Sequence, residues 1–164
     1  MLFNLLKRSL EVVSLAILIT LAVVVVVAVI FRYSGQSLVW YDEIASVLFA
    51  WLTYFGAALA ALNRSHLGFT GVIESLPRNL RVVLFIVADA TVVIFAGLCA
   101  YGGAYVLQIF GNETLVSLPI PLAVTQSIIP IGFGLFALAH LASAPRAFRE
   151  LMDGPEFKVE ESAV

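Results

Sequence analysis

The sequence predicts an all-α integral membrane protein with four transmembrane helices and both termini in the cytoplasm. The prediction rests on composition, on four long apolar windows and on the distribution of basic residues. Of the 164 residues, 62% are apolar and only 12% are charged, and the mean hydropathy is +1.04. An average soluble domain is about 45–50% apolar, so the composition places the chain in the membrane class.

Four windows are apolar enough to cross a bilayer, which takes about 20 residues for a hydrocarbon core of about 30 Å. They cover residues 12–31, 44–62, 82–109 and 118–144, within one transmembrane domain over residues 1–145. The first window follows Lys7 and Arg8, as a secretory signal would. Its apolar run is too long for a signal, and no small-x-small cleavage pattern follows. We therefore expect it to be retained.

The basic residues predict the orientation. Eight of the nine lysines and arginines fall on one side of this arrangement, and only Arg32 falls on the other. Short cytoplasmic loops are enriched in Lys and Arg, so both termini are predicted to be cytoplasmic. In a bacterial or archaeal host the chain would lie in the inner membrane, and the loop after Arg32 would face the periplasm.

Two inner segments are predicted to be less regular than the spans. The connection at 63–81 allows a short interfacial helix at 69–76, with Thr70 as its N-cap and Pro77 at its end. The tail at 146–164 carries five acidic residues after Arg149 and has no periodic apolar pattern. We expect this tail to be disordered.

The second span has two unlike faces. Small or weakly polar residues recur at helical spacing: Ser46, Ala50, Thr53, Ala57 and Ala60. A stripe of bulky residues lies nearly opposite: Leu48, Trp51, Phe55, Leu59 and Leu62. Because small residues let helices approach closely in lipid, the small stripe is predicted to face the bundle and the bulky stripe to face lipid or another subunit.

The third and fourth spans contain residues that favour bends. The third span is longer than the bilayer core requires, and Gly102-Gly103 is its predicted bend site. Ala96, Ala100 and Ala104 form a ridge of small residues on the same helix. Pro130 predicts a kink in the fourth span.

Asp89 and His140 are the ionisable residues that lie inside the predicted spans. An intramembrane ionisable group needs a partner and indicates function by default. His140 should lie at a similar depth to Asp89, and Arg64 or a nearby hydroxyl are the other candidate partners. Asp89 is either a paired structural group of the bundle or a functional residue, and the sequence alone leaves both interpretations open.

The sequence contains no signature of an enzyme or of a metal or cofactor site. We find no glycine-rich phosphate loop, paired catalytic carboxylates, nucleophile elbow or Cys/His metal spacing. The net charge of −2 gives no indication of nucleic-acid binding. A carrier that acts alone would place several ionisable residues along a midplane path. A non-catalytic supporting subunit without a cofactor is therefore the favoured class.

A set of residues around the second span resembles a known family. The set is, in chain order, Phe31-Arg32-Tyr33, Trp40-Tyr41-Asp42-Glu43, Trp51, Gly56-Ala57-Ala58, Arg64-Ser65-His66 and Pro130-Ile131-Gly132. In order and spacing it is similar to the small membrane subunit of tripartite ATP-independent periplasmic (TRAP) transporters, the DctQ-like family. Size, four spans and inner termini are also similar, so that the resemblance covers residues 1–145.

The resemblance implies a scaffold in a sodium-driven importer of organic acids. A periplasmic binding protein would deliver the solute to a large membrane subunit that carries the substrate and sodium sites, and this chain would brace that subunit within the lipid. The residues that match the family's motifs, and are candidates for partner contacts, are Arg32, Trp40, Asp42, Glu43, Trp51, Arg64 and His66.

Simpler structural roles stay open for several of these residues. Asp42 and Glu43 would also be favoured at the start of a helix by its dipole, and Trp40 fits an aromatic belt. Two other functions stay open as well. One is a membrane redox subunit that binds haem through His66 and His140, and the other is an autonomous oligomeric carrier.

Overall fold

The computed structural model describes residues 2–36, 38–63 and 77–153, and within them the chain is helical apart from its loops. The helices are α1 (Leu2–Tyr33), α2 (Tyr41–Leu62), α4 (Arg78–Phe110), α5 (Leu122–Gln126) and α6 (Ile128–Asp153). Four of the helical stretches are long and apolar enough to cross a membrane: Asn4–Tyr33, Tyr41–Leu62, Arg78–Phe110 and Leu122–Arg149. The prediction of an all-α protein with four such helices is confirmed.

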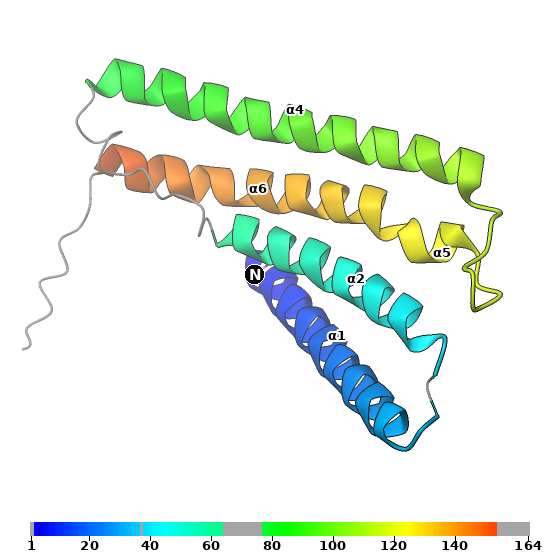
Figure 1. Ribbon diagram of the computed structural model, residues 1–164. Helices are drawn as coiled ribbons and strands as arrows, with labels where there is room; N and C mark the ends of the chain where they lie inside the picture. Colours follow the sequence, from blue (N-terminus) through cyan, green and yellow to red (C-terminus); the bar gives the residue numbers. More distant parts are fainter. Residues whose placement is uncertain (1, 37, 64–76, 154–164) are drawn as a thin grey trace, which may run out of the picture.

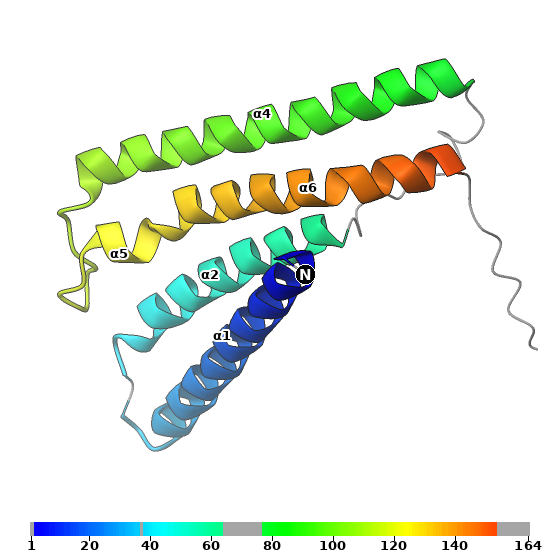
Figure 2. The same ribbon diagram turned by 180° about the vertical axis from the view of Figure 1, so that it is seen from behind.

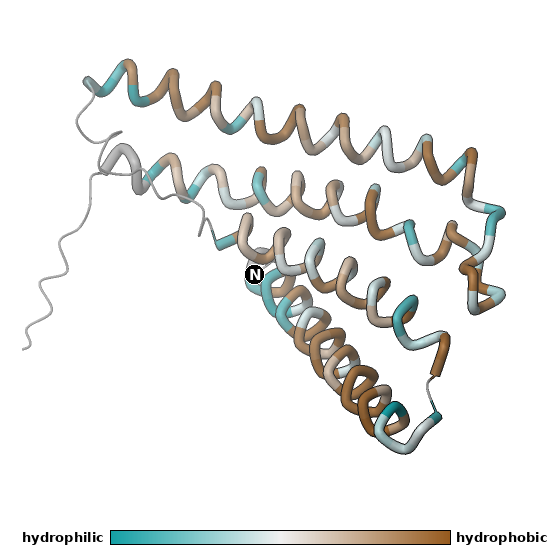
Figure 3. Tube along the Cα trace, viewed as in Figure 1, coloured by the Kyte–Doolittle hydropathy of each residue, from teal (hydrophilic) through white to brown (hydrophobic). Residues whose placement is uncertain are grey.

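The long helices lie in a row. α2 packs against both α1 and α6, and α4 packs mainly against α6, so the order across the row is α1, α2, α6, α4. Figures 1 and 2 show α1 crossing α2 obliquely and α4 running beside α6. α1 begins and α6 ends on the same side of the molecule, as four successive crossings require (Figure 1). We name this side the inner side and the opposite side the outer side. Hydrophobic residues extend along most of α1 and α4 in Figure 3, while most polar residues lie near helix ends and in loops.

The fourth span is divided where proline makes an unbroken helix unfavourable. Pro130 has no N–H to donate to the carbonyl of Gln126, and its ring would clash with that carbonyl in a regular helix. α5 ends at Gln126, and α6 begins at Ile128 with Pro130 in its first turn. The break therefore lies three residues before the proline whose kink was predicted. The inner end of α6 continues to Asp153, so residues 146–153 are helical, and the rest of the acidic tail lies outside the described residues.

The predicted faces of α2 were wrong. Ser46 and Thr53, from the small stripe, are exposed, and each hydroxyl donates to the carbonyl four residues earlier. The inner end of α2 instead buries Leu62, 2% exposed, in a cluster with Leu10 of α1 and Ala139 of α6. Phe55 and Leu59 of the bulky stripe pack against this cluster. The bulky stripe therefore faces the neighbouring helices, because large apolar side chains fill the space between them.

Glycines on α4 and α6 let helices approach closely. A Cβ on Gly103 would lie 2.6 Å from Cγ2 of Ile129, at the start of α6. α4 is continuous through Gly102 and Gly103, so the glycine pair does not interrupt the helix where a bend was predicted. Ala96 is buried on the same face as Gly103, in agreement with the ridge of small residues.

A pair of glycines two positions apart on α6 provides a matched test of this packing. A Cβ on Gly132 would lie 2.6 Å from the Cβ, Cγ and Cδ1 atoms of Tyr54, whereas a Cβ on Gly134 meets nothing within 4 Å. Gly132→Ala is expected to destabilise the protein by about 1–3 kcal/mol through overpacking. Gly134→Ala should be neutral or slightly stabilising, because Ala is the better helix former. Thermal unfolding of both variants in the same detergent measures this, and equal melting temperatures would contradict it.

Candidate functional site

Glu43 connects two distant parts of the chain at the outer end of the molecule. Its Oε1 accepts hydrogen bonds from the backbone N–H of Val116, at 2.9 Å, and of Ser117, at 3.1 Å. Its Oε2 accepts from the N–H of Ser117 at 3.0 Å and from the Ser117 hydroxyl. The carboxylate thus binds the loop between α4 and α5 to the first turn of α2.

The loop between α4 and α5 is built to present those N–H groups. It begins at Gly111, whose N–H donates to Leu107 O at 2.9 Å, and Thr114 pairs with Pro121 in an isolated β-bridge. The N–H of Leu115 donates to Ile120 O at 3.0 Å, which closes the loop around Val116 and Ser117. Because both oxygens of a carboxylate can accept hydrogen bonds, Glu43 provides acceptors for the N–H groups of Val116 and Ser117.

Trp51 makes a second contact between a side chain of α2 and the backbone of a distant segment, about two helical turns further along α2 than Glu43. Its Nε1 donates to the carbonyl oxygen of Thr125 at 3.1 Å, and Thr125 is the residue before the last of α5. A buried indole N–H needs an acceptor, and the break between α5 and α6 leaves carbonyl groups without the usual helical donor. Trp51 was predicted as a candidate for partner contacts, and the structure places it against the chain's own broken helix.

The remaining outer candidates, Arg32, Trp40 and Asp42, are exposed. Arg32 lies in the last turn of α1, after which Gly35 takes a left-handed φ of 79° and turns the chain toward α2. Asp42 is exposed in the first turn of α2, next to Glu43. Trp40 precedes α2 with 39% of its surface exposed, and Val116 is 99% exposed on the loop that Glu43 holds.

Asp89 and His140 meet between α4 and α6. Nε2 of His140 lies 2.9 Å from Oδ1 of Asp89, and the two side chains are 13% and 14% exposed, respectively. His140 was the first candidate partner for Asp89, and the structure confirms this pairing. Ser143, one turn along α6, donates to Ala61 O at 3.2 Å and so fastens the same part of α6 to α2.

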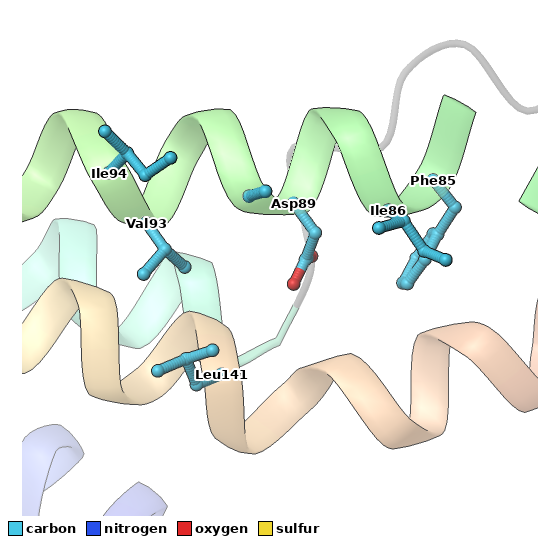
Figure 4. A pocket seen from close by; sticks show the side chains of 7 residues that line it. Phe85, Ile86, Asp89, Val93, Ile94 and Leu141 are labelled. Atoms are coloured by element: carbon cyan, nitrogen blue, oxygen red, sulfur yellow. The ribbon is translucent and has the colours of Figure 1, made fainter. Parts of the chain in front are cut away.

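A groove of about 370 Å³ opens beside this pair (Figure 4). Its apolar lining comes mostly from α4, and Figure 4 shows the carboxylate of Asp89 between α4 and α6. The lining includes Phe85, Ile86, Val93 and Ile94 of α4 and Leu141 of α6.

The structure therefore divides the predicted residues into an outer and an inner group. Glu43 and Trp51 hold the outer loop and the broken helix, and Asp89 and His140 hold the inner part of α4. Arg64 and His66, with the predicted interfacial helix at 69–76, lie outside the described residues. Among the described residues no three His, Cys, Asp or Glu side chains could together hold a metal ion. Sequence reasoning missed Ser117 and Thr125, because neither residue type nor spacing marks a partner 74 positions away.

Comparison with known proteins points to one family. The model of the DctQ component of tripartite ATP-independent periplasmic transporters matches residues 21–150. The C4-dicarboxylate TRAP transporter small permease protein DctQ of Rhodobacter capsulatus is 30% identical over 67% of this chain and 49% of its own length. The isethionate TRAP transporter permease protein DctMQ of Oleidesulfovibrio alaskensis is 25% identical over 68% of this chain and 19% of its own length. The ectoine TRAP transporter small permease protein TeaB of Halomonas elongata is 28% identical over 83% of this chain and 72% of its own length. The chain thus aligns with about half of the first relative and a fifth of the second.

The contribution of Glu43 to holding the loop can be tested by comparing its substitution with that of Asp42, the preceding residue. Glu43→Ala removes every acceptor that faces Val116 and Ser117, so backbone amides of the 111–121 loop should exchange with deuterium several-fold faster. Asp42→Ala removes an exposed carboxylate from the same helical turn and should leave the loop unchanged. Hydrogen–deuterium exchange by mass spectrometry distinguishes the two variants, and equal protection of the loop in both would show that Glu43 does not hold it.

The Asp89–His140 pair can be tested with a double-mutant cycle. Asp89→Leu and His140→Leu should each lower the stability, since each removes one side of the polar contact. The double variant should lose less than the sum of the two, with a coupling energy of about 1 kcal/mol, in the range measured for polar contacts between membrane helices. Unfolding in mixed detergent gives the four stabilities, and additive effects would mean that the 2.9 Å contact contributes nothing.

Proposed function

The chain belongs to the family of DctQ components of tripartite ATP-independent periplasmic transporters, and from this premise we propose that it is a non-catalytic scaffold in such a transporter. In this role it would brace a large membrane subunit in the inner membrane of a bacterium or archaeon. That subunit would carry the solute and sodium sites of a sodium-driven importer. The described chain would need no cofactor of its own.

The observation that supports a scaffold best is how the helices are joined. Side chains of α2 bind the loop after α4 through Glu43 and the broken fourth span through Trp51. Ser143 of α6 binds the inner end of α2. These contacts join α2 to the α4–α5 loop and α5 near its outer end and to α6 near its inner end, so they oppose relative motion of these helices of the kind that a carrier needs. Within the apolar windows at residues 12–31, 44–62, 82–109 and 118–144, Asp89 and His140 are the only Asp, Glu, Lys, Arg or His residues.

The row of helices also leaves apolar surface for a membrane partner. α1 and α4 lie at opposite edges, and both expose large apolar side chains, such as Val26 at 57% and Phe95 at 64%. One relative is named DctMQ, a permease protein of which this chain matches 19%. A chain that matches one fifth of a larger permease supports the proposal that the rest of the permease is a separate partner here.

The outer surface is the proposed contact for a periplasmic binding protein. Trp40 and Val116 are exposed there on elements that Glu43 holds together. Contiguous exposed apolar patches mark protein contacts, and we propose that Trp40 and Val116 belong to one such patch. The related proteins are named for C4-dicarboxylate, isethionate and ectoine. Such varied names fit a subunit that does not select the solute, and we propose an organic acid as the solute class.

Reconstitution tests both parts of the proposal. The chain alone in liposomes should give no sodium-dependent flux of organic acids, while the chain with its large subunit and binding protein should give uptake. Trp40→Ala combined with Val116→Asp should leave co-purification with the large subunit intact and lower the uptake. Tyr33→Ala, which removes an aromatic side chain that is 90% exposed before the turn, is the control. Flux through the chain alone would exclude the scaffold role, and normal uptake by the double variant would exclude docking at this surface.

A further inference from the structure

The edge of the row formed by α4 carries two tyrosines on its outward side. Tyr101 and Tyr105 are 75% and 57% exposed, whereas Ala96 and Gly103 of the same helix are buried. With about 100° of rotation per residue, the tyrosines lie on nearly the opposite side of the helix from the two buried residues. They therefore point away from α6, as the position of α4 at the edge of the row in Figure 1 allows.

The two tyrosines lie at the depth of the middle of the bilayer. Gly103 approaches Ile129 closely, and three residues further along α6 Gly132 approaches Tyr54 closely. These contacts put Gly103 about level with the residue of α2 one turn before Tyr54, near the middle of the 22 residues of α2. The tyrosines lie two residues to either side of Gly103, or about 3 Å along the helix axis.

The tyrosine hydroxyls point away from the nearer headgroups. α4 begins on the inner side and ends at Phe110 on the outer side, and helical side chains lean toward the N-terminus of their helix. Tyr105 is five residues before Phe110, or about 7 Å, and Tyr101 is nine residues before it, or about 13 Å. Because both rings lean further inward, both hydroxyls lie in the hydrocarbon.

Other exposed hydroxyls of the spans bond to their own helix. Thr20 of α1, Thr53 of α2 and Thr91 of α4 each donate to the carbonyl four residues earlier, at 2.7–2.8 Å. A tyrosine hydroxyl cannot do this, because the ring holds it away from the backbone. Neither tyrosine hydroxyl of α4 has a hydrogen bond to another described residue. A polar group in hydrocarbon without a hydrogen bond costs free energy, and acyl chains offer no acceptor, so this face suits a protein partner.

The opposite edge of the row has a different surface. Near mid-depth, α1 exposes aliphatic side chains: Leu18, Ile19 and Val23 are 48%, 55% and 55% exposed. These side chains need no hydrogen-bond partner, so lipid chains can cover them without cost. The two edges are therefore not equivalent as surfaces for a membrane partner.

We propose that the outward face of α4 around Tyr101 and Tyr105 binds the large membrane subunit, and that both hydroxyls donate to acceptors on a helix of that subunit. This inference rests on the proposed scaffold role and adds which edge of the row is the interface. Suitable acceptors are side-chain hydroxyl or amide oxygens, which form hydrogen bonds between membrane helices. The permease named DctMQ, of which this chain matches 19%, supports a larger membrane partner rather than a second copy.

Photocross-linking in the complex with the co-expressed large subunit tests the interface. Leu98 is 65% exposed on the same face as the tyrosines, and Ile19 is exposed on α1. Benzoylphenylalanine at position 98 should cross-link to the large subunit, and at position 19 the yield should be several-fold lower. Equal yields would overturn the choice of α4 over α1. A product of twice the mass of this chain would assign the face to a second copy and overturn the proposal.

Co-purification measured in the same samples separates this inference from the scaffold role. If the unaltered chain does not retain the large subunit, the scaffold role itself fails. If the large subunit is retained but position 98 gives no cross-link, the α4 face is not the interface and the scaffold role stands.

The hydroxyls can be tested by removing two oxygen atoms. Tyr101→Phe with Tyr105→Phe should lower the amount of large subunit that stays bound in a detergent challenge several-fold. Tyr33→Phe removes the hydroxyl of a tyrosine that is 90% exposed at the outer end of α1, within reach of water, and should have no effect. The chains without partner should melt at equal temperatures, because these hydroxyls make no contact within the described chain. Unchanged retention in the double variant, or equal loss in Tyr33→Phe, would overturn the role of the hydroxyls.

Discussion

The structure depends on the rule that backbone polar groups within a bilayer must find partners inside the protein. Hydrocarbon offers no hydrogen bonds, so a helix that breaks near or within the membrane leaves donors and acceptors that cost several kcal/mol each if unpaired. This chain breaks its fourth span at Ser127 and enters it through an irregular loop. α2 supplies the missing partners, with the Trp51 indole for Thr125 O and the Glu43 carboxylate for the amides of Val116 and Ser117. The break is thus stabilised from a neighbouring helix.

This dependence explains why some features could be predicted from the sequence and others could not. The four spans follow from composition and length, and they are confirmed. The partner of Asp89 could also be inferred, because helices of known direction place residues at calculable depths, and His140 is at the right one. Contacts such as Glu43 with Ser117 depend on how a loop folds back over a helix. No periodicity in the sequence records that geometry.

The wrong prediction for the faces of α2 has a physical cause. Small residues permit close helix packing, but they do not require it, and hydroxyls such as those of Ser46 and Thr53 can be satisfied by their own helix. Here the close approach comes from glycine on the partner helix, where Gly132 leaves room for Tyr54. A large residue on one helix and a glycine on the next give the same short distance as two small residues. The sequence of one helix alone therefore cannot tell which of its faces is buried.

The central position of α6 unites the outer and inner contacts. α6 packs against both α2 and α4, so α4 is held in the row mainly through α6, at the glycine contact near Ile129 and at the Asp89–His140 pair. The two contacts differ in kind, because the first is close packing and the second is polar. A polar contact in lipid has few competing partners and so fixes the register of α4 along α6 more specifically than apolar packing can. Register in turn sets the depth at which Arg78 and Arg81, at the start of α4, lie relative to the other helices.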